Sequence, residues 1–120
     1  MFSNVFLPDG VETRYNVKIP MRGGINLSAD IYFPKIRSGL IPAILSRTPY
    51  DNTAMGTAED AAFFVQRGFA WVAQDCRGRF DSGGVFVPWV NEAEDGHDTI
   101  EWIGRQPWSD GNVGMHGPSY

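Results

Sequence analysis

Continuous apolar runs alternate with helical segments in the second half of the chain, and this alternation constrains the fold more than any other feature. The runs 40–45 and 69–75 show no regular polar alternation, which is typical of strands buried on both faces of a sheet. A helix over residues 57–68 fits between them, with Thr57 as its cap and Gly68 as its stop. Strand, helix and strand in this order predict a parallel pair joined by a crossover helix.

A second helix and a third strand continue the alternation. Asn91 is predicted as the N-cap, with Glu94 three residues later at the spacing of a capping box, and Pro107 stops the helix. Residues 113–116 then form a short final strand. Right-handed crossovers place the two helices on definite faces of the sheet.

An extended hairpin precedes these units. Tyr15, Val17 and Ile19 alternate with polar residues, the period of a half-buried strand, and residues 27–32 repeat the alternation. An Arg-Gly-Gly stretch at residues 22–24 supplies the turn. We therefore predict an α/β fold with an antiparallel entry hairpin at a sheet edge, followed by parallel strands and crossover helices.

Composition excludes several function classes. The formal net charge of −4 gives no reason to expect a nucleic-acid partner. No run approaches the roughly 20 apolar residues of a membrane helix, and the N-terminus has no apolar run of the signal-peptide type. Cys76 is the single cysteine, so no internal disulfide can form, which fits a reducing compartment. We expect one small, soluble, cytoplasmic domain with no membrane association.

The chain closes on a Gly-Pro-Ser-Tyr stretch, Gly117 to Tyr120, directly after the last predicted strand. A serine nucleophile requires an exposed bend, small neighbours and an N–H aimed at the oxyanion, and the strand–turn–helix motif G-x-S-x-G supplies all three. The second glycine of that motif would be residue 121, which lies beyond this sequence. The residues alone leave two interpretations open, a nucleophile elbow at Ser119 and an ordinary turn.

Five blocks of the sequence, taken in order, resemble the cocaine esterase-like (CocE/NonD) family, which includes the X-Pro dipeptidyl-peptidases and the α-amino acid ester hydrolases. The blocks are PMRGGINLSADIYFP, ILSRTPYD, GFAWVAQDCRGRFDSGG, EAEDGHDTIEWIGRQPW and SDGNVGMHGPSY. Together they cover nearly the whole chain from Tyr15 onward, and five ordered blocks are far more specific than any one of them. The resemblance implies an α/β-hydrolase fold, with residues 1–120 as the N-terminal part of its catalytic domain, ending at the nucleophile elbow.

The resemblance also implies roles for particular residues. Ser119 would be the acylating nucleophile, the Tyr50 hydroxyl would donate to the oxyanion, and the backbone N–H of Tyr120 would be the second donor. Tyr50 also follows the end of a predicted buried strand, where α/β sheets bind ligands, although a rim tyrosine with its hydroxyl in water would have the same position. Asp51 would meet a substrate amine if the protein favours α-amino substrates.

The implied activity is that of a serine hydrolase that cleaves acyl esters or X-Pro peptide bonds through an acyl-enzyme, with no metal or organic cofactor. The triad acid and histidine, a helical cap and a C-terminal jelly-roll domain are expected downstream of Ser119. A serine without its base is a poor nucleophile, so the isolated 120-residue chain is expected to have little or no activity. The remainder could be a separate chain, and a homo-oligomer is also open. The alternative is a non-catalytic α/β fragment or binding module in which Gly117 to Tyr120 is a structural turn.

Other polar and aromatic residues have structural interpretations. His97 and His116 precede Ser119, whereas hydrolases of this fold order the triad as serine, acid and histidine, so neither fits as the base. Their separation of 19 positions does not support a metal site, and the glycines of GNVGMHG do not have the dinucleotide-binding spacing. We expect ion pairing for Asp75, Arg77 and Asp81, a helix-dipole role for Glu92, Glu94 and Asp95, and packing for Cys76, Trp89, Trp102 and Trp108.

Overall fold

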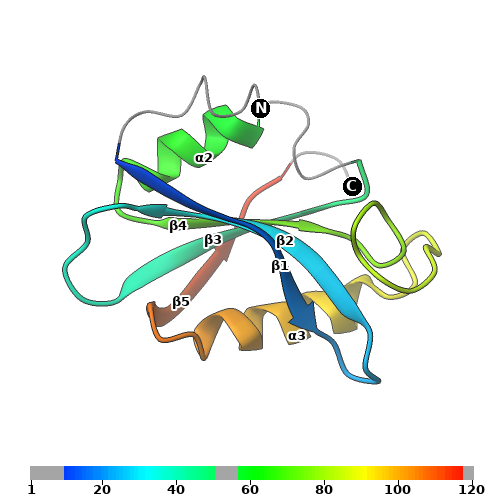
Figure 1. The fold of residues 1–120 in the computed structure, drawn as a ribbon. Coiled ribbons are helices and arrows are strands. Elements are labelled where there is room, and N and C mark those ends of the chain that lie inside the picture. The colour runs from blue at the N-terminus through cyan, green and yellow to red at the C-terminus, as the bar shows by residue number, and fades with distance from the viewer. Residues whose placement is uncertain (1–9, 51–56, 118–120) are drawn as a thin grey trace.

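The computed structural model describes residues 10–50 and 57–117. Within them lie five strands and two helices (Figure 1). In chain order they are β1 (Val11–Pro20), β2 (Asn26–Pro34), β3 (Ile41–Thr48), α2 (Thr57–Val65), β4 (Ala70–Asp75), α3 (Glu92–Gly104) and β5 (Ser109–Met115). The order of strands and helices is the one that the sequence predicts.

The strands form one mixed sheet in the order β1-β2-β4-β3-β5. β1 pairs antiparallel with β2, and β2 pairs antiparallel with β4, whereas β3 is parallel to both β4 and β5. Figure 1 shows α2 on one face of the sheet and α3 on the other. The predicted α/β class, with an antiparallel entry hairpin at the sheet edge followed by parallel strands, is confirmed.

The turn of the entry hairpin needs glycine. Gly23 and Gly24 have φ angles of 85° and 93°, a region that side chains with a Cβ rarely adopt. The N–H of Met21 donates to the carbonyl of Ile25 at 2.7 Å and closes this turn. The hairpin that results places β1 at the outer edge, where its residues 14–16 are exposed.

β2 differs from the predicted half-buried strand, because both of its faces are buried from Leu27 to Phe33. It lies between β1 and β4 in the sheet, so neither of its edges is open. The polar residues that the alternation assigned to solvent are instead hydrogen-bonded inside. The N–H of Ser28 donates to Ser82 Oγ at 2.8 Å, and Asp30 Oδ1 accepts from the N–H of Asn16 at 2.9 Å.

Two apolar clusters hold the helices to the sheet. On the α3 face, Phe33 and Trp108 meet edge to face with their ring centroids 5.0 Å apart. On the α2 face, the ring of Phe64 stacks on that of Trp71 with the ring centroids 5.4 Å apart. This arrangement explains why β4, which contributes to both clusters, is buried along its whole length.

Element ends deviate from the predicted ones. β5 begins at Ser109, four positions before the predicted start, and Leu40 lies exposed outside β3. Asn91 occupies the N-cap of α3, but its side chain makes no capping hydrogen bond, so the capping-box interpretation is wrong in that detail. In the described part of the chain, neither helix has the length and hydropathy that a membrane span requires.

Candidate active site

The carboxyl ends of β3, β4 and β5 meet at one edge of the sheet. In the parallel registers Thr48 lies beside Asp75, and Leu45 lies beside Met115. Two backbone hydrogen bonds extend the ladders past the strand ends, because the N–H groups of Cys76 and His116 each donate at 3.0 Å, to the carbonyls of Thr48 and Leu45.

This edge contains a topological switch point. The chain leaving β3 leads to α2 on one face of the sheet, and the chain leaving the adjacent β4 leads to α3 on the other face (Figure 1). Loops that diverge in this way leave a crevice between neighbouring strand ends, which is where open α/β sheets bind ligands. The fold therefore selects the ends of β3 and β4 as the place for a site.

Tyr50 lies at this place, two residues past the end of β3, and about half of its surface is exposed. Its N–H donates to Thr48 Oγ1 at 2.9 Å. The carbonyl before it, that of Pro49, accepts a hydrogen bond from Arg79 Nε at 2.9 Å. The structure thus places Tyr50 at the carboxyl end of β3, on a backbone that is hydrogen-bonded on both sides.

The other predicted site residues, Asp51, Ser119 and Tyr120, lie outside the described residues, and their roles stay predictions. The structure describes the chain up to Gly117, two residues before Ser119. A Cβ placed on Gly117 would lie 3.8 Å from Ser46 Oγ of β3, so the chain leaves β5 alongside β3.

The two histidines lie apart. The ring of His116 packs against Phe64 and Trp71 on the α2 side of the sheet. Its centroid lies 5.5 Å from the ring centroid of Phe64 and 5.7 Å from that of Trp71. His97 is exposed on α3, on the opposite side. Within residues 10–50 and 57–117, no group of three His, Cys, Asp or Glu side chains is arranged to hold a metal ion.

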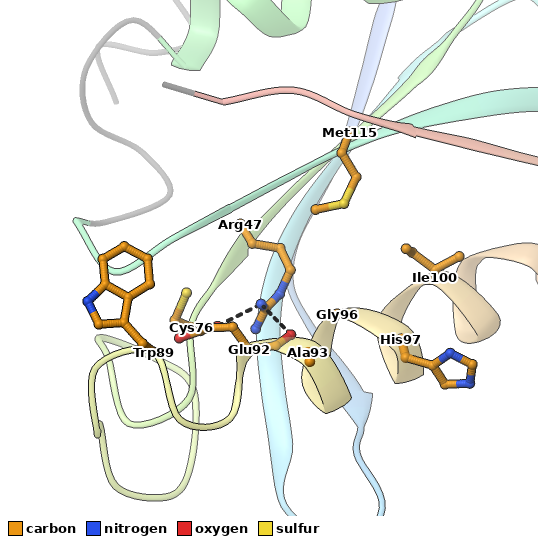
Figure 2. A pocket seen from close by; sticks show the side chains of 9 residues that line it. All are labelled: Arg47, Cys76, Trp89, Glu92, Ala93, Gly96, His97, Ile100 and Met115. Atoms are coloured by element: carbon orange, nitrogen blue, oxygen red, sulfur yellow. Dashed lines mark hydrogen bonds and ion pairs between the residues drawn. The ribbon is translucent and has the colours of Figure 1, made fainter. Parts of the chain in front are cut away.

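A pocket of about 480 Å³ opens on the α3 side of this edge (Figure 2). Cys76 lines it but is buried, and burial raises the pKa of its thiol to about 12, so the thiol stays protonated at neutral pH. This agrees with the packing role predicted for Cys76. The packing prediction is wrong for Trp89, which is 69% exposed at the pocket rim, whereas Trp108 is buried and Trp102 packs against the core.

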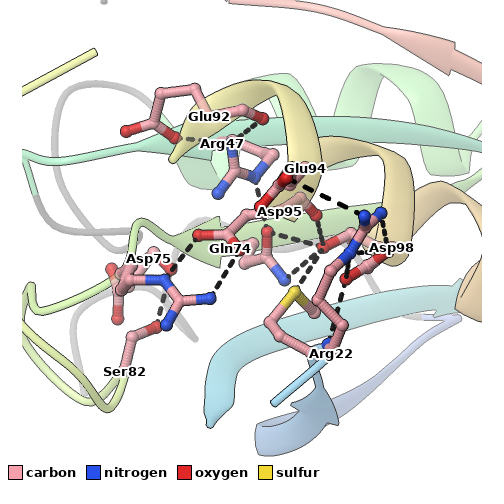
Figure 3. A network of polar contacts seen from close by, with 12 residues as sticks. Arg22, Arg47, Gln74, Asp75, Ser82, Glu92, Glu94, Asp95 and Asp98 are labelled. Atoms are coloured by element: carbon pink, nitrogen blue, oxygen red, sulfur yellow. Dashed lines mark hydrogen bonds and ion pairs between the residues drawn. The ribbon is translucent and has the colours of Figure 1, made fainter. Parts of the chain in front are cut away.

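A network of polar side chains joins the strand ends to α3 (Figure 3). Arg47, whose side chain is only 7% exposed, donates to Glu92 Oε1 at 2.7 Å and to Gln74 Oε1 at 2.6 Å. Gln74 Nε2 donates to Thr99 Oγ1 at 2.9 Å, and Thr99 Oγ1 lies 2.7 Å from the carbonyl of Asp95. The network fixes the direction in which α3 leaves the edge of the sheet.

The acidic first turn of α3 does more than complement the helix dipole. Each of its three carboxylates also pairs with an arginine from another element, and the pairs are Glu92 with Arg47, Glu94 with Arg22 and Asp95 with Arg77. The ion pairing predicted for Arg77 is therefore confirmed. The sequence patterns did not predict these partners. The feature that could have indicated them is the presence of three arginines near strand ends and turns, together with three acidic residues in one helical turn.

Asp75, the last residue of β4, and Asp81 of the following loop contribute backbone carbonyls as acceptors. Asp75 is buried, and its backbone carbonyl accepts from Ser82 Oγ at 2.6 Å. The backbone carbonyl of Asp81 accepts from Lys18 Nζ at 3.0 Å. Both contacts tie the loop to the sheet through main-chain atoms.

Known proteins with similar sequences support a family assignment. The family model for X-Pro dipeptidyl-peptidase (S15 family) matches residues 23–120. The cocaine esterase of Rhodococcus sp. (strain MB1 Bresler) is 47% identical over 109 residues, which are 88% of this chain and 19% of that protein. The chain spans about a fifth of the length of the curated relatives it matches.

Solved structures of related hydrolases share the fold. An α-amino acid ester hydrolase matches with a TM-score of 0.78 and 35% identity, over 92% of this chain and 22% of that one. A CocE/NonD family hydrolase from Staphylococcus aureus matches with a TM-score of 0.78 and 26% identity, over 96% of this chain and 27% of that one. The described sheet is thus an N-terminal portion of an α/β-hydrolase fold. With its family model matching residues 23–120, this chain belongs to the X-Pro dipeptidyl-peptidase family, S15.

Proposed function

We propose that the complete protein containing this chain is a serine hydrolase that cleaves acyl esters or X-Pro peptide bonds. The main supporting observation is the position of Tyr50, which lies just past the carboxyl end of β3. β5 ends beside β3, and Ser119 follows β5 in the sequence. Family membership supports the reaction class, because the relatives matched here include esterases and an ester hydrolase.

The reaction proceeds in two steps. Ser119 Oγ attacks the substrate carbonyl while a histidine from the downstream chain, oriented by a downstream acid, takes the hydroxyl proton. The Tyr50 phenol and the N–H of Tyr120 donate hydrogen bonds to the oxyanion. The leaving alcohol or amine takes the proton from the histidine, and water then hydrolyses the acyl-enzyme to release the acid. No step requires a metal or an organic cofactor.

Tyr50 suits this role because a phenol donates a hydrogen bond while it remains neutral at physiological pH. One such donor stabilises the transition state by roughly 3–4 kcal/mol. Asp51, the next residue in the chain, would bind an α-amino group on the substrate, which lies on the acyl side of the bond that is cleaved.

A fluorophosphonate probe tests the proposal in the complete protein. We expect covalent labelling of Ser119, and Ser119→Ala should remove both the labelling and the turnover of p-nitrophenyl esters or X-Pro p-nitroanilides. Tyr50→Phe should lower kcat by roughly 10²–10³-fold with little change in KM. Absence of both labelling and turnover in the complete protein would favour the non-catalytic alternative. Full turnover in Ser119→Ala would contradict the role of Ser119 as the nucleophile.

A further inference from the structure

The loop that follows β4 folds back onto the segment that carries Tyr50. Arg79, in this loop, donates through Nε to the carbonyl of Pro49 at 2.9 Å, and the two residues are 30 positions apart in the sequence. The carbonyl that accepts this bond belongs to the peptide unit that leads directly into Tyr50. A side chain from one strand end therefore holds the backbone at the neighbouring strand end.

Other bonds hold the same segment, but they leave Arg79 a distinct role. The N–H of Cys76 donates to the carbonyl of Thr48 at 3.0 Å, and the N–H of Tyr50 donates to Thr48 Oγ1 at 2.9 Å. Pro49 has no N–H, so its carbonyl is its one backbone polar group. The Arg79 side chain donates to this group, and neither of the other two bonds involves the Arg79 side chain.

Arg79 is itself well supported. Its guanidinium carbon lies 5.0 Å from the ring centroid of Phe80 and 5.3 Å from that of Phe86, both within cation–π range. The backbone around it forms a tight turn, because the N–H of Arg79 donates to Cys76 and the N–H of Ser82 donates to the carbonyl of Arg79. A partly buried arginine on a closed turn is pre-organised to hold its partner in one position.

We propose that Arg79 is a positioning residue for Tyr50, an inference that rests on the proposed function. By holding the Pro49 carbonyl, it fixes the backbone from which the phenol reaches the oxyanion. Displacement of a catalytic group by about 1 Å can cost up to 10²-fold in rate, so a small shift of Tyr50 has a measurable effect. Arg79 acts through Tyr50 and does not touch the substrate. The effect of an Arg79 substitution on kcat should therefore depend on the presence of the Tyr50 hydroxyl.

A double-mutant cycle in the complete protein tests this dependence. We expect Arg79→Met to lower kcat for a p-nitrophenyl ester roughly tenfold with KM nearly unchanged, and Arg79→Lys to retain most of kcat. In a Tyr50→Phe background the same Arg79→Met change should lower kcat less than about twofold, because the group it positions is already absent. If Arg79→Met fails to fold, Arg79→Gln takes its place in the same cycle.

Arg67 provides a matched control. Its Nη1 donates to the carbonyl of Phe63 at 2.8 Å, and its guanidinium lies over the Phe63 ring at 3.7 Å, beside α2 and away from the loop after β4. Arg67→Met should leave kcat unchanged. Wild-type kcat in Arg79→Met, or an equal loss with and without the Tyr50 hydroxyl, would overturn the inference. Wild-type kcat in Tyr50→Phe would instead contradict the proposed function, whatever Arg79 does.

Discussion

Arg77 and Asp95 form a two-point ion pair that ties the loop after β4 to the first turn of α3. Arg77 Nε and Nη2 donate to the two carboxylate oxygens of Asp95 at 3.0 and 2.8 Å. The Asp95 side chain is 1% exposed, so this arginine replaces the water that the carboxylate lost on folding. The hydrogen bond also holds the pKa of Arg77 above its ordinary value.

Replacing Asp95 with asparagine should destabilise the protein by roughly 3 kcal/mol, because it leaves the charge of Arg77 without its buried partner. The matched control is Glu94→Gln, since Glu94 meets Arg22 at 3.9 Å in an exposed pair and should change stability by less than about 1 kcal/mol. Urea denaturation of the variants measures both effects. Equal losses in the two variants would show that burial does not set the strength of these pairs.

Gly78 should not tolerate even alanine. Its φ angle is 73°, and a Cβ at this position would lie 2.0 Å from the backbone nitrogen of Phe86. We expect Gly78→Ala to cost at least about 3 kcal/mol, because backbone strain and a clash with main-chain atoms act together.

Gly104→Ala is the opposite case and serves as the control. No atom lies within 4 Å of a Cβ placed there, at the end of α3, so alanine should stabilise the protein by about 0.5–1 kcal/mol. Thermal unfolding of the two variants should therefore shift the melting temperature in opposite directions.

The pair of Arg22 and Asp98 should make stability depend on pH in the acid range. Hydrogen bonds from the side chain and the N–H of Arg22 hold the pKa of Asp98 well below its ordinary value. The folded pKa is therefore lower than the unfolded one, about 3.9, so the stabilisation is present above about pH 4 and is lost as the pH falls toward the folded pKa.

Denaturation of wild type and Asp98→Asn at pH 7 and near pH 2.5 measures this effect. The stability difference between the two proteins should shrink in acid. In an Arg22→Gln background the difference should be smaller at pH 7 and should change less with pH, since the side-chain hydrogen bonds of Arg22 are gone and only the backbone N–H of residue 22 still donates to Asp98. A difference that stays constant from pH 7 to pH 2.5 would contradict the assignment.

Local sequence patterns were sufficient to predict the strands and helices and their order. The apolar runs predicted the strands β3 and β4. Burial on both faces is confirmed for β4, whereas β3 alternates buried and half-buried positions, so that part of the prediction is wrong for β3. The same patterns failed for β2, where Ser28 and Asp30 are buried. Alternation reports which side chains are polar, but burial of both faces depended on what packs over them. The α3-side cluster covers one face, and Ser82 of the loop after β4 and the α2-side cluster around Tyr32 cover the other.

The sequence by itself determined the α/β class, the order of elements and the position of Tyr50 after a buried strand, because propensity and periodicity act over a few neighbouring residues. Only the tertiary structure decided the contacts around that position. Arg47 meets Glu92 across 45 residues, and Arg79 meets Pro49 across 30. Such pairs depend on the order of the strands in the sheet and on the paths of the loops that connect them. No local sequence pattern contains that information.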